Sequence, residues 1–132
     1  MLHPLASAKP ARYQRYDWNT DQLAEWYEVD PSRLVIIEGI YCTRSELAHY
    51  YMFRVWVQAS RSVRLVREIE RDGETRASKW TGLWMPAEDR YVQLDDPQRR
   101  ADLLLDGTST IPHDLKTQYV RITQAHESAA KE

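Results

Sequence analysis

The sequence has little cysteine, little glycine and no long hydrophobic run. Cys42 is its single cysteine, which excludes an intramolecular disulfide framework and a zinc site built from cysteines alone. No stretch approaches the roughly eighteen consecutive apolar residues of a membrane-spanning helix, and the N-terminal segment lacks the uninterrupted apolar core of a secretory signal. The sequence therefore predicts a cytoplasmic protein that has no membrane association.

Charge of neither sign dominates the chain. The formal net charge is -2 over 132 residues, of which 29% are charged and 42% are apolar. Proteins that bind nucleic acid in bulk are usually strongly basic, so no nucleic-acid partner is predicted, although this balance does not exclude a local basic face. The histidines have no metal-ligand spacing, and no metal site is expected. The length suits one domain, which we place at residues 1–123, followed by a polar tail at 124–132.

Runs of branched apolar residues predict three strands of a mainly parallel sheet. These runs lie at residues 34–39, 52–59 and 103–107. A run that is apolar at nearly every position indicates a strand buried on both faces, which is typical of a parallel sheet covered by helices. Residues 119–123 are compatible with a short edge strand, although their periodicity is weak.

Helical spacing and capping residues predict helices between these strands. Thr20 suits the N-cap of one helix, and Ser60 suits the N-cap of another that Asp72-Gly73 ends. Residues 1–19 are expected to be extended or irregular. The predicted helices cover residues 20–29, about 44–50, 60–71 and about 77–94. Strands that alternate with helices imply right-handed crossovers and an α/β fold.

Five segments occur in an order that resembles a known family. They are RYDW (15–18), VIIEGIY (35–41), FRVWVQASRSVRLVREIERDG (53–73), EDRY (88–91) and RADLLLDG (100–107). Over about residues 1–120 the chain resembles the uridine kinase-like family of P-loop nucleoside kinases. The resemblance implies a three-layer α/β fold with a mainly parallel sheet. It also implies transfer of a phosphoryl group from ATP, with Mg²⁺, to a nucleoside-like hydroxyl.

One motif of that family is missing from the sequence. The resemblance predicts a loop G-x-x-x-x-G-K-[ST] after a first buried strand, where backbone N–H groups and the lysine hold the triphosphate. None of the lysines in this chain follows a glycine. We therefore expect a truncated P-loop kinase-like domain that lacks the first strand and the phosphate loop and is not active alone. ATP and Mg²⁺ are implied by the resemblance only, and the chain by itself is compatible with no cofactor.

The missing strand also bears on the partners of the chain. According to the resemblance, that strand lies between the strands at 34–39 and 52–59, and its absence would leave unpaired backbone groups on both. Either these two strands pair directly, or another segment replaces the missing one. We expect a homo-oligomer, or a partner chain that completes the sheet.

Glu38 is the candidate catalytic residue. It ends an otherwise apolar predicted strand, and ligands of α/β sheets gather outside the carboxyl ends of the strands. The resemblance implies that Glu38 lies near the metal and the phosphates. The alternative is an ion pair with one of the arginines.

A polar and aromatic group near the N-terminus is the candidate nucleoside site. Asp17 can accept hydrogen bonds from sugar hydroxyls, and Tyr16 or Trp18 can stack on a base. The alternative for this group is a surface loop in which Asp17 caps a backbone turn. The candidate substrate-binding residues are Arg12, Arg15, Tyr16 and Asp17.

A stripe of arginines follows one side of the predicted helix at 60–71. Planar guanidinium groups match phosphate oxygens, and the resemblance places such arginines next to a lid over the triphosphate. The alternative is a solvated face whose arginines pair with Glu68, Glu70 and Glu74. The candidate phosphate-binding residues are Arg64, Arg67 and Arg71.

Two functions remain open from the sequence. The first is a nucleoside kinase-like domain that is a remnant or a part of an ATP-dependent phosphotransferase and needs a missing half. The alternative is a non-catalytic module for nucleoside or nucleotide binding, or for oligomerisation. Trp80, Trp84 and Tyr91 share helical spacing, which favours packing over a base-stacking platform.

Overall fold

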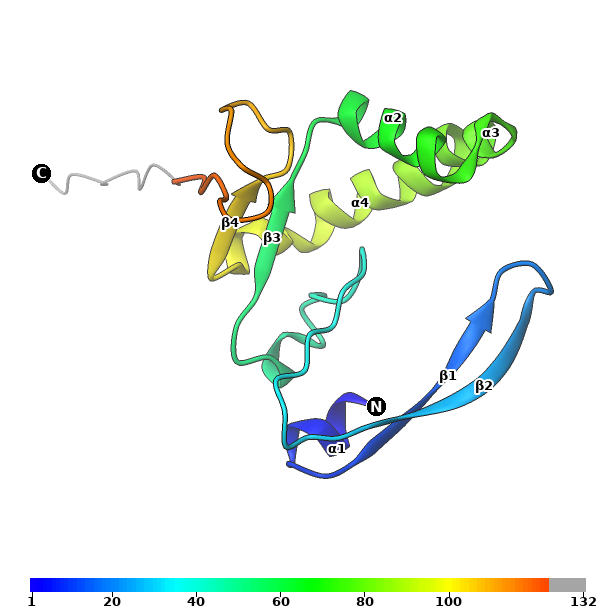
Figure 1. The fold of residues 1–132 in the computed structure, drawn as a ribbon, viewed down its shortest axis with the longest axis vertical. Helices are drawn as coiled ribbons and strands as arrows, with labels where there is room; N and C mark the ends of the chain where they lie inside the picture. The colour runs from blue at the N-terminus through cyan, green and yellow to red at the C-terminus, as the bar shows by residue number, and fades with distance from the viewer. Residues whose placement is uncertain (124–132) are drawn as a thin grey trace, which may run out of the picture. The chain divides into compact units, whose positions relative to one another are not determined.

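The computed structural model describes residues 1–123, so the predicted tail at 124–132 lies outside the described residues. The chain divides into two compact units, Met1–Met52 and Phe53–Glu132. Helices and strands occur in both units (Figure 1). None of the described helices is long and apolar enough to cross a bilayer.

The first unit is built around an antiparallel hairpin. A short helix α1 (Leu2–Ala6) precedes strands β1 (Ala11–Asp17) and β2 (Gln22–Val29), which pair with each other. The expectation of an extended or irregular segment at 1–19 agrees with the extended chain of β1 but missed the short helix α1, whereas the prediction of a helix at 20–29 is wrong. Cross-strand contacts favour a strand over a helix in this segment. Tyr13 lies opposite Tyr27, and their rings stack with centroids 5.4 Å apart.

A β-bulge interrupts the hairpin near its turn. Gln14 is paired with Trp26 but Tyr16 with Leu23, so the register shifts by one residue between these two pairs. The side-chain amide of Gln14 donates a 2.8 Å hydrogen bond to the backbone carbonyl of Ala24 in the bulged region. A side chain of β1 thus satisfies a backbone acceptor of β2 where the ladder is irregular.

The apolar run at residues 34–39 is not a strand in this structure, and the predicted burial is wrong. Leu34 is 89% exposed and Ile36 is 81% exposed. A strand forms only where a neighbour supplies ladder hydrogen bonds, and within the described residues this run has no neighbouring strand. The helix predicted at 44–50 is limited to a single 3₁₀ turn, η1 (Ala48–Tyr50).

The second unit contains a parallel pair of strands, as predicted. Strands β3 (Val55–Gln58) and β4 (Leu103–Asp106) pair in register from Val55 opposite Leu103 to Gln58 opposite Asp106. The predicted edge strand at 119–123 is reduced to one antiparallel bridge, from Leu105 to Arg121. Each sheet of the described chain has two strands, and the three-layer sheet implied by the resemblance stays a prediction.

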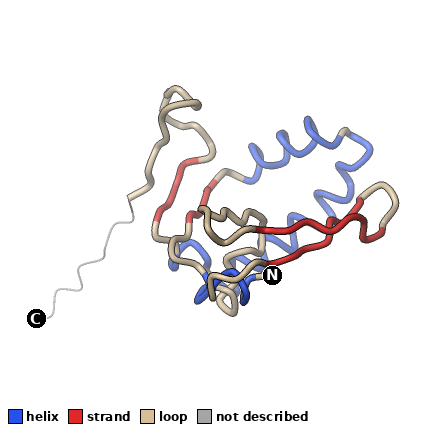
Figure 2. The backbone as a smooth tube through the Cα atoms, turned by 60° about the horizontal axis from the view of Figure 1, so that its bottom comes forward, coloured by secondary structure: helices blue, strands red, loops and turns tan. Residues whose placement is uncertain are grey.

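Helix α2 (Arg61–Asp72) has the ends that the sequence predicts. It begins after Ser60, whose hydroxyl accepts a hydrogen bond from the backbone N–H of Val63 at 3.4 Å. It ends at Gly73, where φ is +85° and a side chain would strain the backbone. Figure 2 shows α2 and the following helical segments in blue.

The predicted helix at 77–94 is present but changes type along its length. Its parts are η2 (Glu74–Arg76), α3 (Ala77–Lys79), the π-helical turn η3 (Trp80–Trp84) and α4 (Met85–Asp95), with the 3₁₀ turn η4 (Pro97–Arg100) after it. In the π-helical turn the backbone N–H of Met85 donates to the carbonyl of Trp80. The large buried apolar side chains of this unit are Trp80, Met85, Tyr91 and Leu104. Trp80 and Tyr91 therefore have the packing role that their spacing favours.

Gly107 lies where the chain leaves β4 and passes close to β3. A Cβ at this position would meet Val57 Cγ1 at 2.8 Å and the backbone oxygen of Gln58 at 3.3 Å. We expect Gly107→Ala to lower the free energy of unfolding by about 1–3 kcal/mol because the two strand ends must separate. Urea unfolding measures this loss. Gly82→Ala is the matched control, since nothing lies within 4 Å of its Cβ, and an equal loss in both variants would contradict the steric explanation.

Candidate functional site

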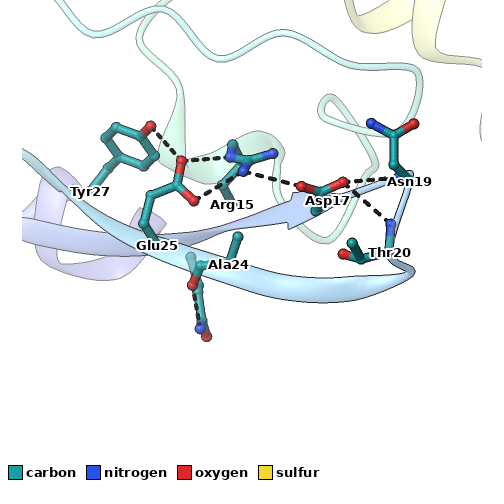
Figure 3. A network of polar contacts seen from close by, with 8 residues as sticks. Arg15, Asp17, Asn19, Thr20, Ala24, Glu25 and Tyr27 are labelled. Carbon is teal, nitrogen blue, oxygen red and sulfur yellow. Dashed lines mark hydrogen bonds and ion pairs between the residues drawn. The ribbon is translucent and has the colours of Figure 1, made fainter.

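Two of the predicted substrate-binding residues, Arg15 and Asp17, contact each other on the hairpin of the first unit. Arg15 forms a two-point ion pair with Glu25, with Nε to Oε1 at 2.7 Å and Nη2 to Oε2 at 3.0 Å (Figure 3). The same guanidinium reaches Asp17 Oδ2 at 3.4 Å, and the hydroxyl of Tyr27 donates to Glu25 at 2.8 Å. The result is a continuous polar network across both strands on one side of the hairpin.

Asp17 organises the turn between β1 and β2. Its Oδ1 accepts the backbone N–H of Asn19 at 2.9 Å and that of Thr20 at 3.4 Å. These bonds hold the pKa of Asp17 below its ordinary value, with a smaller contribution from Arg15. The alternative that Asp17 caps a backbone turn is confirmed, and a sugar hydroxyl would have to share a carboxylate that already has protein donors.

The ion pair between Arg15 and Glu25 gives the hairpin a specific pH dependence. Hydrogen bonds from Arg15, with support from Tyr27, lower the pKa of Glu25 from 4.5 to about 2. A carboxyl whose pKa is lowered on folding contributes its stability in full above the unfolded pKa and loses it as the pH falls through the folded value.

We expect the Glu25 side-chain carboxyl to titrate at about 2 in the folded chain, and the hairpin to weaken as the pH falls from about 4.5 toward 2. NMR titration of the Glu25 carboxyl carbon measures this midpoint. Arg15→Gln should return the midpoint toward 4.5, because it removes the largest cause of the shift. A wild-type midpoint near 4.5 would show that the ion pair does not form in solution.

Aromatic rings surround the turn end of this hairpin. Tyr16 and Trp18 meet edge to face with centroids 4.9 Å apart, and the Tyr16 hydroxyl bonds to the carboxylate of Asp21. Trp18 is 72% exposed, so much of its ring is open to solvent. Arg12 lies nearer the other end of the strand, with its guanidinium 5.3 Å from the ring centre of Trp26 and 3.6 Å from Glu28.

Glu38 does not lie at the end of a strand in this structure. It is exposed and belongs to the segment of the first unit that has no regular structure. The alternative ion pair with an arginine is not formed either among residues 1–123. The Glu38 carboxylate makes a small contribution to raising the pKa of Cys42, after the larger effect of burial.

The predicted arginine stripe lies on α2, and each of its members has an acceptor within the second unit. Arg64 forms ion pairs with Glu88 and, at 3.5 Å, with Asp89. Arg67 donates to the backbone oxygen of Gly107 at 2.7 Å. Arg71 pairs with Asp72 at 2.9 Å and with Glu68, which is one of the partners that the alternative named. A phosphate at these guanidinium groups would replace contacts that already exist.

A cavity of about 530 Å³ opens where β3 and β4 end. Polar side chains from both strand ends and the following loops line it, and they include Gln58, Ser60, Asp106, Thr108, Thr110 and Arg121. The Thr110 hydroxyl, with smaller contributions from the backbone N–H groups of Thr110 at 2.9 Å and Thr108 at 2.8 Å, donates to the Asp106 carboxylate and lowers its pKa. The sequence analysis did not predict these residues as a site. The signal for them was the Asp-Gly-Thr sequence at the carboxyl end of a buried strand, where ligands of α/β sheets bind.

The described residues contain neither a cluster of metal-ligating side chains nor a glycine–lysine phosphate loop. Within residues 1–123, no three histidine, cysteine, aspartate or glutamate side chains lie close enough together to hold a metal ion. The sequence has no lysine after a glycine, and its four glycines lie far apart along the chain.

Comparison with known proteins identifies the class and then the family. The five sequence motifs, in their order along the chain, and the parallel pair β3–β4 are those of a kinase-like protein of the P-loop NTPase superfamily. The model of the Phosphoribulokinase / Uridine kinase family matches residues 1–110, and the chain belongs to this family. The resemblance noted from the sequence is thereby confirmed. No curated protein matches the chain significantly.

Proposed function

We propose that these 132 residues bind the nucleoside acceptor of a uridine kinase-like phosphotransferase and do not transfer phosphate unaided. In the complete kinase, β3 and β4 would belong to a three-layer sheet, and another segment would supply the phosphate loop. ATP and Mg²⁺ would then act with that segment. The family match over residues 1–110 supports the kinase-like part of this proposal.

The observation that carries the nucleoside part is the exposed aromatic edge at the turn of the hairpin. Trp18 offers a largely open ring, and Tyr16 holds it edge to face. Trp18 follows Asp17 directly in the turn, and Asp17 contacts both the guanidinium of Arg15 and the turn backbone. Stacking on an exposed ring suits a nucleobase, and neighbouring polar groups suit its sugar.

The absence of a glycine–lysine loop supports the part of the proposal that concerns activity. Phosphoryl transfer depends on positioning and charge stabilisation, and backbone N–H groups with a lysine provide much of both. Without them we expect no measurable turnover by these residues alone. Glu38 and the arginines of α2 are proposed to contribute only when the triphosphate site is completed.

The second candidate function is a non-catalytic module that binds a nucleoside and transfers nothing. The lack of a metal-binding cluster among the described residues favours it. The two functions differ in one respect, which is whether a segment with a phosphate loop restores turnover. Adding such a segment as a separate polypeptide should give uridine phosphorylation under the first proposal and none under the second.

Titration with uridine and with ATP–Mg²⁺ tests the proposed function. We expect uridine to change tryptophan fluorescence saturably, whereas ATP–Mg²⁺ should not bind. Trp18→Ala should weaken uridine binding by about tenfold in calorimetry, because one stacked base contributes about 1–3 kcal/mol. Leu94→Ala is the matched control, since Leu94 is also 72% exposed but lies on α4.

Two results would overturn the proposal. The first is saturable ATP–Mg²⁺ binding with turnover by this chain alone, which would show that the missing loop is not needed. The second is the absence of uridine binding in the folded wild-type chain.

A further inference from the structure

Asn19 is the single asparagine of the chain, and neither of the usual structural roles of asparagine in a turn accounts for it. One role is to adopt a positive φ, but in this turn the positive φ, +56°, belongs to Asp21. The other role is to cap the turn with its side chain, and here Asp17 does so by accepting the backbone N–H groups of Asn19 and Thr20. The side chain of Asn19 is therefore not needed to hold the turn.

The side-chain amide of Asn19 is open to a ligand. The residue is exposed, and within residues 1–123 its amide forms no hydrogen bond with the protein. Figure 3 shows the amide pointing away from the turn backbone. Asn19 directly follows Trp18, whose ring is 72% exposed, and consecutive Cα atoms lie about 3.8 Å apart. A base stacked on that ring would have its edge within reach of the amide.

A primary amide and the edge of a uracil have complementary hydrogen-bonding groups. The amide provides an N–H donor and a carbonyl acceptor in one plane. Uracil provides the matching pair, because its N3–H donates and its O4 accepts. Unpaired bases are recognised in this way, by stacking on one face and by hydrogen bonds along the Watson–Crick edge. Asn19 beside the open ring of Trp18 therefore offers both kinds of contact.

We propose that the Asn19 amide hydrogen-bonds to the N3–H and O4 edge of a uracil that stacks on Trp18. This inference rests on the proposed function and adds selectivity to it, because stacking alone accepts any base. With the amide engaged, the site favours a base whose hydrogen-bonding edge is free. The site is open to water, so we expect the contact to contribute about three- to tenfold in affinity.

A comparison of uridine with 3-methyluridine tests this contact, because the methyl group replaces the N3 proton. In calorimetry of the full chain, Asn19→Ala should weaken uridine binding by about three- to tenfold. The wild type should bind 3-methyluridine less tightly than uridine, whereas Asn19→Ala should bind the two nucleosides equally within about twofold. Gln93→Ala is the matched control, since it removes an exposed amide from α4 and should leave uridine binding unchanged.

Nuclear magnetic resonance gives a second measurement that does not depend on a substitution. Isotope-labelled asparagine should give one side-chain amide signal, because the chain has one asparagine. Uridine should shift this signal, and 3-methyluridine should shift it less. The φ of Asn19 is not positive, so alanine fits the backbone, and the circular dichroism of Asn19→Ala should match that of the wild type.

The results distinguish this inference from the proposed function. If uridine binds the wild type and Asn19→Ala equally well, the inference is overturned while the proposed function stands, because stacking on Trp18 would then suffice. An equal loss of affinity for uridine and 3-methyluridine in Asn19→Ala would also overturn it, since the amide would then not contact N3–H. If no nucleoside binds the folded wild-type chain, the proposed function fails and this inference fails with it.

Discussion

Replacing Trp80 with alanine should lower the free energy of unfolding of the second unit by about 3–5 kcal/mol. Trp80 is 8% exposed, and its ring meets that of Trp84 edge to face with centroids 4.5 Å apart. Its Nε1 donates to Asp72 at 3.1 Å, and the guanidinium of Arg71 lies 5.7 Å from the ring centre. The substitution therefore removes a buried ring, an aromatic pair and a hydrogen bond together. Urea unfolding followed by near-UV circular dichroism measures the loss.

Two comparisons separate these contributions of Trp80. Trp80→Phe keeps a buried ring but loses the bond to Asp72, so its loss should be smaller than that of Trp80→Ala. Trp18→Ala removes an indole that is 72% exposed, and its effect should stay within about 0.5 kcal/mol. If Trp18→Ala and Trp80→Ala cost the same, the burial of Trp80 in the second unit would be refuted.

Met85→Ala should cost about 2–5 kcal/mol, because it leaves a cavity at the start of α4. Met85 is 1% exposed and is the largest fully buried side chain among residues 1–123. Thermal and urea unfolding of the variant and the wild type measure the difference.

The neighbouring Leu83 provides the control for Met85. Leu83 is 60% exposed, so Leu83→Ala should change stability little, although it removes a side chain of similar volume. Met85→Leu conserves volume and should cost less than about 1.5 kcal/mol. A loss in Met85→Leu as large as that in Met85→Ala would mean that shape, and not volume, dominates at this position.

Elements with local start and stop signals could be predicted from the sequence. The N-cap Ser60 and the terminal Gly73 set the ends of α2, and both act through contacts within a few residues. The runs that became β3 and β4 were also predicted, because each has its partner within the second unit. Local chemistry was sufficient in these cases.

The first unit shows where the sequence was insufficient. The spacing of Leu23, Trp26 and Tyr27 suits a helix, but these residues lie on β2. The stacking of Tyr13 on Tyr27 stabilises the strand, and this contact cannot be read from the spacing of residues along the sequence. The run at 34–39 has the composition of a strand, yet composition supplies no ladder partner. Pairing between distant residues is the information that was missing.

The candidate site was predicted in part for the same reason. Residues 15–17 are adjacent in sequence and stay together on the hairpin, so their grouping was predictable. Their partner Glu25 comes from the opposite strand, and the acceptors of Arg64 and Arg67 lie on α4 and after β4. Those contacts depend on tertiary structure. Because of them, the predicted nucleoside-binding residues and the predicted phosphate-binding arginines already have partners within the protein.

The π-helical turn at Trp80–Trp84 determines which way two core side chains face. In an α-helix, residues five apart point in directions that differ by about 140° around the axis, so Trp80 and Met85 would diverge. The bond from Met85 N–H to the Trp80 carbonyl widens the turn, which brings the directions of the two residues closer together. Shortening this turn by one residue would restore ordinary winding and rotate one of them into solvent. The π-helical turn thus contains one residue more than an α-helical turn, and the packing of Trp80 and Met85 in the core depends on that extra residue.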